Sequence, residues 1–203
     1  MSSIFKLHAL PVYQKSNNFV LTETERKKIL SLDFVKDGYE GVNISNNSFI
    51  LEDPDLVRIK DFLNDAFAWF KDNVLEINND FRLTQSWATI NKMFSYHHKH
   101  NHPNSMFSIV YYAEVESGDL MLDFPYGRIQ ERFNFSYDVK NWNEFNSHSW
   151  RFKLNTGDIL IFPSWLDHYS TPNQADSDRI IIGANYFITG TVGNTENVDL
   201  INL

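Results

Sequence analysis

The stretch Tyr96-His97-His98-Lys99-His100-Asn101-His102-Pro103-Asn104-Ser105 holds four of the seven histidines of the chain within six residues. In an extended stretch, side chains alternate between two faces, so that His98, His100 and His102 share one face. A neutral imidazole binds metal ions through one ring nitrogen, and two histidines spaced i and i+2 can hold one ion. The sequence therefore indicates part of a metal site, with a solvated His-rich turn as the alternative.

A second stretch offers a third ligand, because the apolar segment Leu160-Ile161-Phe162-Pro163-Ser164-Trp165-Leu166-Asp167-His168 ends in histidine. Arg179 follows at the start of the last apolar segment. Three protein ligands on one side of a metal ion leave positions open for a chelating cosubstrate and dioxygen. An arginine can bind the far carboxylate of such a cosubstrate through two hydrogen bonds. Alternatively, Arg179 is a surface residue that pairs with Asp176 or Asp178.

The composition is that of a globular protein rich in strand-forming residues. The 203 residues suffice for one domain, and 42% are hydrophobic and 15% aromatic. A net charge of −8 argues against general nucleic-acid binding, which needs a basic patch. The absence of cysteine excludes disulfides, iron–sulfur clusters and thiolate zinc sites. Without a signal-like start or an apolar run of roughly 18 residues, we expect a cytoplasmic protein that does not bind membranes.

The first 80 residues predict a strand and two helices. Residues 4–13 read as an edge strand broken by a proline. Thr22-Glu23-Thr24-Glu25 is a capping box, which predicts a helix to about Leu32. Residues 33–50 read as polar and irregular.

A second helix is predicted from Asp53-Pro54, where a capping residue precedes a proline at the first helical position. Its apolar residues recur at helical spacing, at Leu56, Ile59, Leu63, Phe67, Phe70, Val74 and Ile77. Such a stripe is typical of a helix that packs against a sheet.

From Gln85 onward the pattern changes to short strands separated by Gly- and Asn-containing turns. The candidates are residues 85–95, 106–115, 119–124, 128–135, 149–154, 158–162 and 179–188. Seven strands after two helices predict a mainly β fold with the N-terminal helices packed outside a sandwich or barrel. We expect a single domain over 1–203, with strand and helices in 1–80, a catalytic core in 85–190 and a loose tail in 191–203.

Several pieces together resemble the 2-oxoglutarate- and iron(II)-dependent oxygenases of the prolyl-hydroxylase-like type. They are Ser86-Trp87, Asn91, His100-Asn101-His102-Pro103-Asn104-Ser105, Val110-Tyr111-Tyr112, Phe162-Pro163-Ser164-Trp165-Leu166-Asp167-His168 and Arg179. The nearest branch is uncharacterised and frequent in tailed phages and marine bacteria, which implies the host cytoplasm for a phage-encoded protein. The resemblance covers about residues 85–190 and implies a double-stranded β-helix, the cupin-like jelly roll of these oxygenases.

The resemblance also implies the site and its chemistry. It places iron(II) on His100, His102 and His168, and the distal carboxylate of 2-oxoglutarate on Arg179. The implied reaction consumes 2-oxoglutarate and O2, releases succinate and CO2, and hydroxylates a C–H bond of a protein side chain or a small molecule. Three further residues are candidates to line the cosubstrate pocket: Asn91, Ser108 and Tyr112.

Two positions depart from the superfamily pattern. Position 102 is commonly Asp or Glu, and a histidine there should weaken iron(II) retention and leave the metal more positive. Asp123 or Asp167 could supply the missing carboxylate, and His98 could replace His102 as a ligand. The second departure is Ile181, where Ser or Thr is common, so that a hydroxyl from another strand must compensate.

Two other functions fit parts of the sequence. Three histidines and a water molecule also describe a catalytic zinc site in a hydrolase. A cupin-like structural protein without catalysis is the other alternative. In an oxygenase, the long aromatic loop 136–148 is where we expect substrate specificity.

Overall fold

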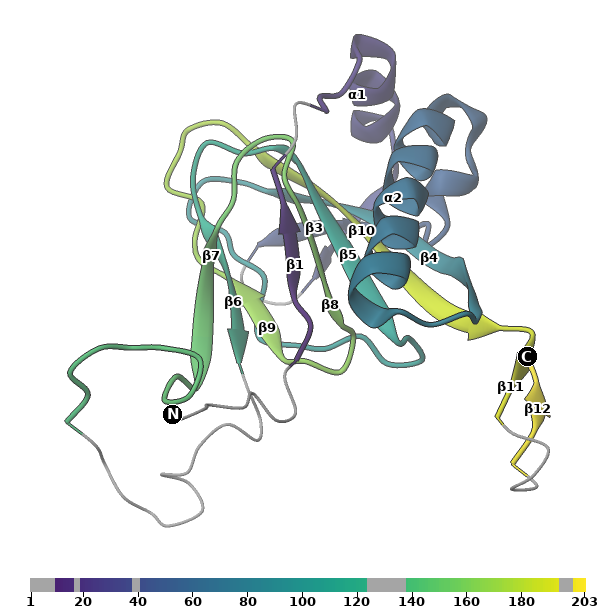
Figure 1. Cartoon of the computed structure of the whole chain (residues 1–203). Helices are drawn as coiled ribbons and strands as arrows, with labels where there is room; N and C mark the ends of the chain where they lie inside the picture. Colours follow the sequence, from purple (N-terminus) through teal and green to yellow (C-terminus); the bar gives the residue numbers. More distant parts are fainter. Residues whose placement is uncertain (1–9, 17–18, 38–40, 124–137, 194–198) are drawn as a thin grey trace.

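The computed structural model describes residues 10–16, 19–37, 41–123, 138–193 and 199–203. Two antiparallel sheets lie against each other, and the helices lie beyond the larger sheet (Figure 1). In spatial order, the seven strands of the larger sheet are β1 (Tyr13–Lys15), β8 (Ile159–Pro163), β5 (Phe107–Glu114), β10 (Arg179–Thr189), β4 (Asp80–Asn91), β3 (Val42–Ser45) and β2 (Phe34–Asp37). The smaller sheet consists of β7 (Ser149–Lys153), β6 (Asp119–Asp123) and β9 (His168–Ser170). The predicted mainly β class is confirmed.

The histidine-rich stretch extends the smaller sheet along β9. His100 and His168 lie opposite each other in a bridge and exchange both backbone hydrogen bonds, at 3.0 and 2.8 Å. Further along, the His102 N–H donates to the carbonyl of Ser164 at 2.9 Å. Backbone pairing therefore brings together two stretches that are far apart in the sequence.

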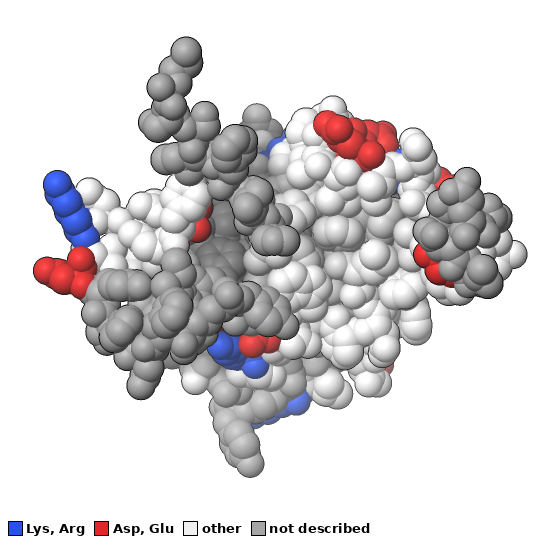
Figure 2. Space-filling model, turned by 60° about the horizontal axis from the view of Figure 1, so that its bottom comes forward, with Lys and Arg blue, Asp and Glu red and all other residues white. Residues whose placement is uncertain are grey.

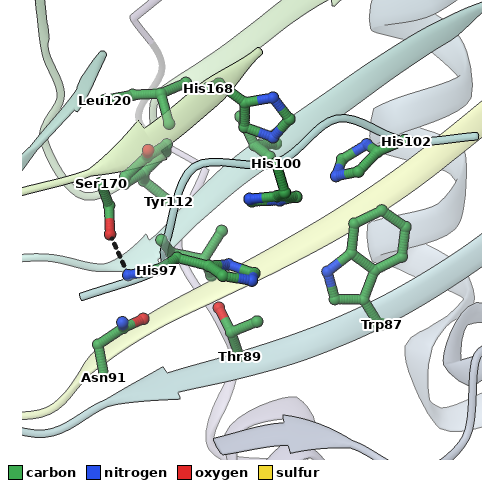
Figure 3. Close-up of a pocket in the computed structure, with 12 residues that line it drawn as sticks. Trp87, Thr89, Asn91, His97, His100, His102, Tyr112, Leu120, His168 and Ser170 are labelled. Carbon is green, nitrogen blue, oxygen red and sulfur yellow. Dashed lines mark hydrogen bonds between the residues drawn. The ribbon is translucent and has the colours of Figure 1, made fainter. Parts of the chain in front are cut away.

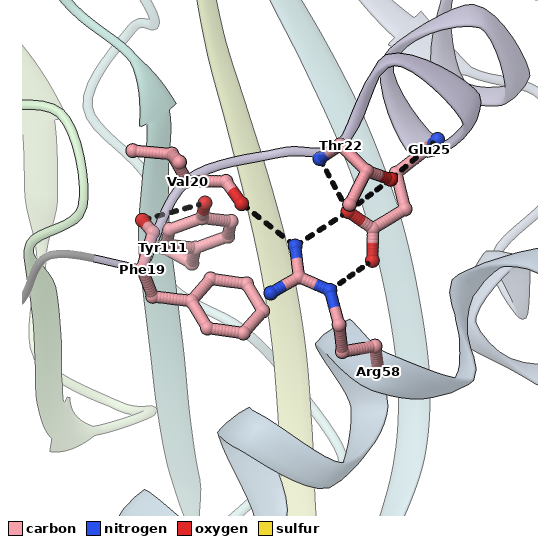
Figure 4. A network of polar contacts seen from close by, with 6 residues as sticks. All are labelled: Phe19, Val20, Thr22, Glu25, Arg58 and Tyr111. Atoms are coloured by element: carbon pink, nitrogen blue, oxygen red, sulfur yellow. Dashed lines mark hydrogen bonds and ion pairs between the residues drawn. The ribbon is translucent and has the colours of Figure 1, made fainter.

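The predicted capping box starts the first helix, α1 (Glu23–Leu30). The Thr22 N–H donates to Glu25 Oε2 at 2.7 Å, and the Glu25 N–H donates back to Thr22 Oγ1 at 3.2 Å. Figure 4 shows how Arg58 of the second helix then binds both the Glu25 carboxylate and the carbonyl of Val20. This network ties α1 and the chain before it to the second helix.

The second helix, α2 (Val57–Phe70), follows a 3-10 turn, η2 (Pro54–Leu56), that is capped by Asp53 as predicted. Its buried residues are Ile59, Leu63, Ala66, Phe67 and Phe70, and they pack against the larger sheet. The prediction of the apolar stripe is wrong at its end, where α2 is followed by a π-helical turn, η3 (Lys71–Leu75). The wider turn rotates the later residues, so that Val74 is 42% exposed and Leu75 contacts the core instead.

The prediction that residues 33–50 are irregular is wrong. They contain β2, β3 and the start of a short 3-10 turn, η1 (Ile50–Glu52). The two strands sit at the edge of the sheet and pair through backbone groups, which requires little apolar alternation in the sequence. The tail predicted to be loose contains a small hairpin of β11 (Thr191–Val192) and β12 (Ile201–Asn202).

Three other predictions concern residues outside the described ranges. The predicted strand 128–135 lies outside them, and only 138–148 of the loop 136–148 is described. Residues 4–9 of the predicted edge strand 4–13 also lie outside them, and the described strand at this end, β1, begins only at Tyr13. Among the described residues, no helix combines the length and the apolar character needed to cross a bilayer.

Along strand β10, alternate residues face opposite sides of the larger sheet. Alternate residues Ile180, Ile182, Ala184 and Tyr186 belong to the core shared with α2. The residues between them face the smaller sheet, as the contacts of Arg179 with Ser170 and Thr171 show. The space between the sheets is where the sequence-predicted site residues meet.

Candidate metal centre

Three imidazole rings converge between the sheets. His100, His102 and His168 each offer a ring nitrogen, and these atoms lie within 4.8 Å of one another (Figure 3). His100 and His102 come from the extended stretch beside β9, and His168 is the first residue of β9. Three ligands on one side of an ion are the arrangement that leaves coordination positions open.

The hydrogen bonds of the rings suit metal binding. His100 Nδ1 lies 2.7 Å from the carbonyl of His98, and His168 Nδ1 lies 2.9 Å from the carbonyl of Leu166. A carbonyl only accepts, so Nδ1 carries the proton in both rings, and Nε2 keeps its lone pair for a metal. The residues present therefore fit an iron(II) ion.

Burial keeps the rings of His102 and His168 in the neutral form that metal ligation requires. His168 is 3% exposed, and burial, reinforced by the neighbouring rings of His100 and His102, lowers its pKa well below the usual value. Burial and the neighbouring rings of His100 and His97 lower the pKa of His102 to about 3. Protons therefore compete little with a metal ion at neutral pH.

The structure separates the other proposed ligands from this group. Asp123 and Asp167 approach Lys99, at 2.5 and 3.9 Å, and Asp167 also accepts from Asn101. Neither carboxylate belongs to the histidine group within the described part of the chain. His98 is also outside the group, and its carbonyl holds the His100 ring instead.

The expected alternation of faces along the histidine stretch is wrong for its first half. His97 was expected on the opposite face, but its ring lines the cavity and stacks on His100 with ring centroids 4.1 Å apart. The backbone bends at Lys99, between His97 and His100, so the simple alternation of an extended strand does not apply across it. The sequence alone gave no signal of this bend.

The rings border a cavity that encloses about 430 Å³ of space, including its open mouth. It is lined by Trp87, Thr89, Asn91, His97, His100, His102, Val110, Tyr112, Leu120, His168, Ser170 and Ile181 (Figure 3). Asn91 and Tyr112, two of the three candidates for the cosubstrate pocket, are among these lining residues. Ser108 does not line the cavity; its hydroxyl lies 2.6 Å from His102 Nδ1, on the side away from the other rings.

Arg179 lies beside Asn91, its direct partner across β10 and β4. The side chain is 1% exposed, so the alternative of a surface residue paired with neighbouring aspartates is wrong. Asp178 pairs with Lys92 instead, at 2.5 Å. Burial lowers the pKa of Arg179, whose guanidinium nonetheless stays charged at neutral pH.

The hydrogen bonds of Arg179 are incomplete. One terminal nitrogen donates to the carbonyl of Thr171 at 3.1 Å, and the other donates to Ser170 Oγ at 3.0 Å. Arg179 Nε and Asn91 Nδ2 are both buried without an acceptor in the described structure. Unpaired buried donors are costly, and two of them on directly paired residues, one of them a cation, fit a carboxylate. Arg179 does not itself line the cavity, but Asn91 and Ser170, which Arg179 contacts, both do.

Gly118 makes room for this guanidinium. A Cβ on Gly118 would lie 1.8 Å from the nearest terminal nitrogen of Arg179, and the glycine has a φ of +96°. Any side chain here would collide with the arginine and strain the backbone.

The hydroxyl missing at Ile181 has two possible replacements. Ile181 pairs with Thr89 on β4 and with Tyr112 on β5, and all three line the cavity. Burial raises the pKa of Tyr112, so its phenol stays protonated and can donate. Thr89 was missed from the sequence, although its position two residues before Asn91 on one strand indicates the same face.

Trp87 belongs to the motifs of the resemblance, where it had no assigned role. It forms the wall of the cavity beside His102. Its ring meets the His102 ring edge-on, with centroids 5.0 Å apart. It lies over Gly183 of the neighbouring strand, where a Cβ would be only 2.4 Å from the indole. The glycine therefore allows the indole to lie flat against the sheet.

Residues 85–185 match the model of a family described as "Putative 2OG-Fe(II) oxygenase". The fold is similar to HygX from Streptomyces hygroscopicus, solved with nickel and 2-oxoglutarate bound, at 15% identity and a TM-score of 0.61 over 87% of this chain and 82% of that one. It is also similar to a prolyl-4-hydroxylase from Pseudomonas putida, at 12% identity and a TM-score of 0.55 over 89% and 94% of the two chains.

An oxidoreductase of the 2OG-Fe(II) oxygenase family from Burkholderia pseudomallei is similar as well, at 13% identity and a TM-score of 0.59 over 86% and 83%. No curated protein matches the sequence. The solved structures confirm the predicted double-stranded β-helix.

Proposed function

Since the chain belongs, through residues 85–185, to the 2-oxoglutarate- and iron(II)-dependent oxygenases, we propose that it hydroxylates a C–H bond of a protein side chain or a small molecule. The observation that carries this proposal is the arrangement of one cavity. Three imidazoles converge on it, and of the two buried donors without an acceptor, Asn91 Nδ2 belongs to a lining residue and Arg179 Nε to the residue that pairs with Asn91 across β10 and β4. A zinc hydrolase gives these donors no role.

In this proposal His100, His102 and His168 hold the metal through Nε2. Iron(II) bound there supplies the redox chemistry that couples conversion of 2-oxoglutarate and O2 into succinate and CO2 to hydroxylation of the substrate. Imidazole ligands bring no negative charge to a metal ion, so the ion keeps its full positive charge, which favours a dianionic chelator such as 2-oxoglutarate. The protein thereby compensates for the carboxylate that position 102 lacks.

Arg179 and Asn91 bind the distal carboxylate of 2-oxoglutarate. Arg179 Nε and Asn91 Nδ2 gain the acceptors that they lack in the described structure. The phenol of Tyr112 and the hydroxyl of Thr89, on the strands that flank Ile181, donate to the same cosubstrate. The carbonyls of Ser117 and Thr171, which accept from one terminal nitrogen, and the hydroxyl of Ser170, which accepts from the other, fix the direction of the guanidinium before the cosubstrate arrives.

We place substrate selection at the loop 136–148, of which 138–148 are described. Trp142 is 61% exposed and Phe145 is 50% exposed, so neither ring is buried against the barrel. The alternative that these rings pin the loop to the barrel is therefore disfavoured, and both are available to contact a substrate.

On the face seen in Figure 2, the described Lys and Arg side chains are scattered, with no continuous basic surface. The expectation of no general nucleic-acid binding stays a prediction.

Formation of succinate from 2-oxoglutarate tests the proposal. The purified chain, supplied with iron(II), 2-oxoglutarate and air, should form succinate slowly even without substrate, and omission of iron(II) should stop it. His168→Ala should lower the rate by at least about 100-fold. Zinc-dependent ester or amide hydrolysis without succinate formation would instead support the hydrolase.

A further inference from the structure

His102 is held differently from the other two rings of the group. The rings of His100 and His168 each contact the backbone carbonyl two residues earlier in the chain. The corresponding carbonyl for His102 belongs to His100, and it already accepts the N–H of His168 at 2.8 Å. His102 Nδ1 contacts a side chain instead, the hydroxyl of Ser108 at 2.6 Å.

A chain of buried polar groups continues from this hydroxyl. Ser108 Oγ donates to Asn185 Oδ1 at 2.7 Å, and Asn185 Nδ2 donates to Gln85 Oε1 at 2.9 Å. The same Ser108 hydroxyl lies 2.8 Å from Ser164 Oγ, which donates to Ser105 Oγ at 2.7 Å. Ser108 and Asn185 are 0% and 3% exposed. The sheet register brings them together, because Asn185 is paired with Gln85 on one side and with Ser108 on the other.

The direction of these hydrogen bonds determines which ring nitrogen of His102 carries a proton. When Asn185 presents its oxygen to Ser108, the serine must donate to it, and His102 Nδ1–H then donates to the serine. Nε2 is left with its lone pair. A hydroxyl has a single proton, so Ser108 cannot donate it to Nδ1 while it donates to Asn185 or to Ser164. Only without both acceptors would Ser108 donate to Nδ1, and Nε2 would then carry the proton and could not bind a metal ion.

We infer that Ser108, Asn185 and Gln85 are positioning residues that hold His102 as the Nδ1–H tautomer and direct its Nε2 to the metal ion. The inference rests on the proposed ligation by His102. It explains how a histidine functions at a position where a carboxylate is common. A carboxylate binds a metal ion without a choice of tautomer. An imidazole that binds through Nε2 must carry its proton on Nδ1, and this requires an oriented acceptor beside Nδ1.

Cobalt(II) binding to the metal-free full chain is the first test, read from its absorption without any turnover. Ser108→Ala should weaken cobalt(II) binding by about 10- to 100-fold, the effect typical of groups that orient a ligand. Ser86→Ala is the matched control, because Ser86 is also fully buried and its hydroxyl accepts from the Leu51 N–H, away from the rings. The control should bind cobalt(II) as the wild type does.

Substitutions of Asn185 distinguish the effect of the direction of these hydrogen bonds from the effect of their mere presence. Asn185→Asp keeps only acceptors towards Ser108 and forces the metal-competent direction, so cobalt(II) binding should equal or exceed that of the wild type. Asn185→Leu combined with Ser164→Ala removes both acceptors of the Ser108 hydroxyl and should weaken binding as Ser108→Ala does. Equal binding by the wild type, Ser108→Ala and this double variant would overturn the inference.

The tautomer itself can be observed if a variant fails to fold. Long-range proton–nitrogen NMR spectra of the wild-type chain with ring-labelled histidine should show Nδ1–H for His102. A proton on Nε2 would overturn the inference whatever the variants do. A wild type that binds no cobalt(II) would overturn the proposed function instead, and the NMR spectrum would still decide the role of Ser108.

Discussion

The two faces of the larger sheet differ in how well their buried groups are satisfied. On β10, the face towards α2 carries the apolar residues Ile180, Ile182, Ala184 and Tyr186. The face towards the cavity carries Arg179, Ile181, Gly183 and Asn185, and among them is a buried cation with an unpaired nitrogen. The first face stabilises the fold. The second contains a buried donor without an acceptor, which lowers stability, and in the proposed function this donor binds the cosubstrate. Substitutions on the two faces should therefore separate stability from function.

The largest effect on stability is expected from Phe67→Ala on the α2 side. Phe67 is 3% exposed and stacks on Tyr186 with ring centroids 4.0 Å apart. Its removal should lower the free energy of unfolding by about 3–5 kcal/mol, measured by urea denaturation. The exposed Val57→Ala on the same helix should change it by less than about 0.5 kcal/mol. A loss of 2-oxoglutarate affinity in still-folded Phe67→Ala would contradict the separation of the faces.

The reverse pattern is expected from Arg179→Met on the cavity side. Loss of the guanidinium should raise the KM for 2-oxoglutarate by about 100-fold, because the charge-assisted hydrogen bond to the distal carboxylate disappears. Replacing an incompletely bonded buried charge by an apolar chain of similar length should leave the unfolding free energy unchanged or higher. Lys92→Met, which removes a nearby exposed cation, should change neither quantity. Strong destabilisation of Arg179→Met would show that the arginine is structural.

A smaller effect on the cosubstrate is expected from Gly118→Ala. The new methyl group would collide with the guanidinium of Arg179 and displace it from its carbonyl acceptors. The KM for 2-oxoglutarate should rise by about 10-fold, with a loss of stability of about 1–2 kcal/mol from the positive φ. Gly190→Ala, also at positive φ but with open space around it, should show the stability loss without the change in KM.

The smallest effect is expected from Glu25→Gln, and it should depend on pH. Burial raises the pKa of Glu25, but the hydrogen bonds from Arg58 and Thr22 outweigh it, so the pKa is lowered overall. A lowered carboxyl pKa stabilises the fold above the unfolded-state value of about 4.3 and loses this effect as pH falls through the folded value. Near pH 7 the variant should therefore unfold about 1 kcal/mol more easily, a modest figure because Arg58 is 44% exposed. The difference should vanish in acid; a difference that persists there would contradict this assignment.

Local patterns in the sequence predicted much of this molecule. The capping box at Thr22, the apolar face of α2 and most strands of the core follow from short-range spacing. The convergence of His168 with the histidine stretch followed from an i and i+2 pair and an apolar strand that ends in histidine.

Features that depend on pairing between distant strands were not predicted. The place of Thr89 beside Ile181, and the link from Ser108 to Asn185, depend on a register that no single segment encodes. The bend at Lys99 and the π-helical turn after Phe70 each shift a local period without a proline or glycine to mark them. Edge strands such as β2 form through backbone bonds, which leave little trace in side-chain patterns.

Anaerobic absorption spectroscopy tests the central claim most directly, since it detects chelation without a substrate. Iron(II) and then 2-oxoglutarate are added to the metal-free chain. We predict a visible charge-transfer band that requires both additions, is lost in His100→Ala and is weakened in Arg179→Met. If iron(II) binds and 2-oxoglutarate produces no band, the three histidines form a metal site of another kind, and the proposed oxygenase chemistry is contradicted.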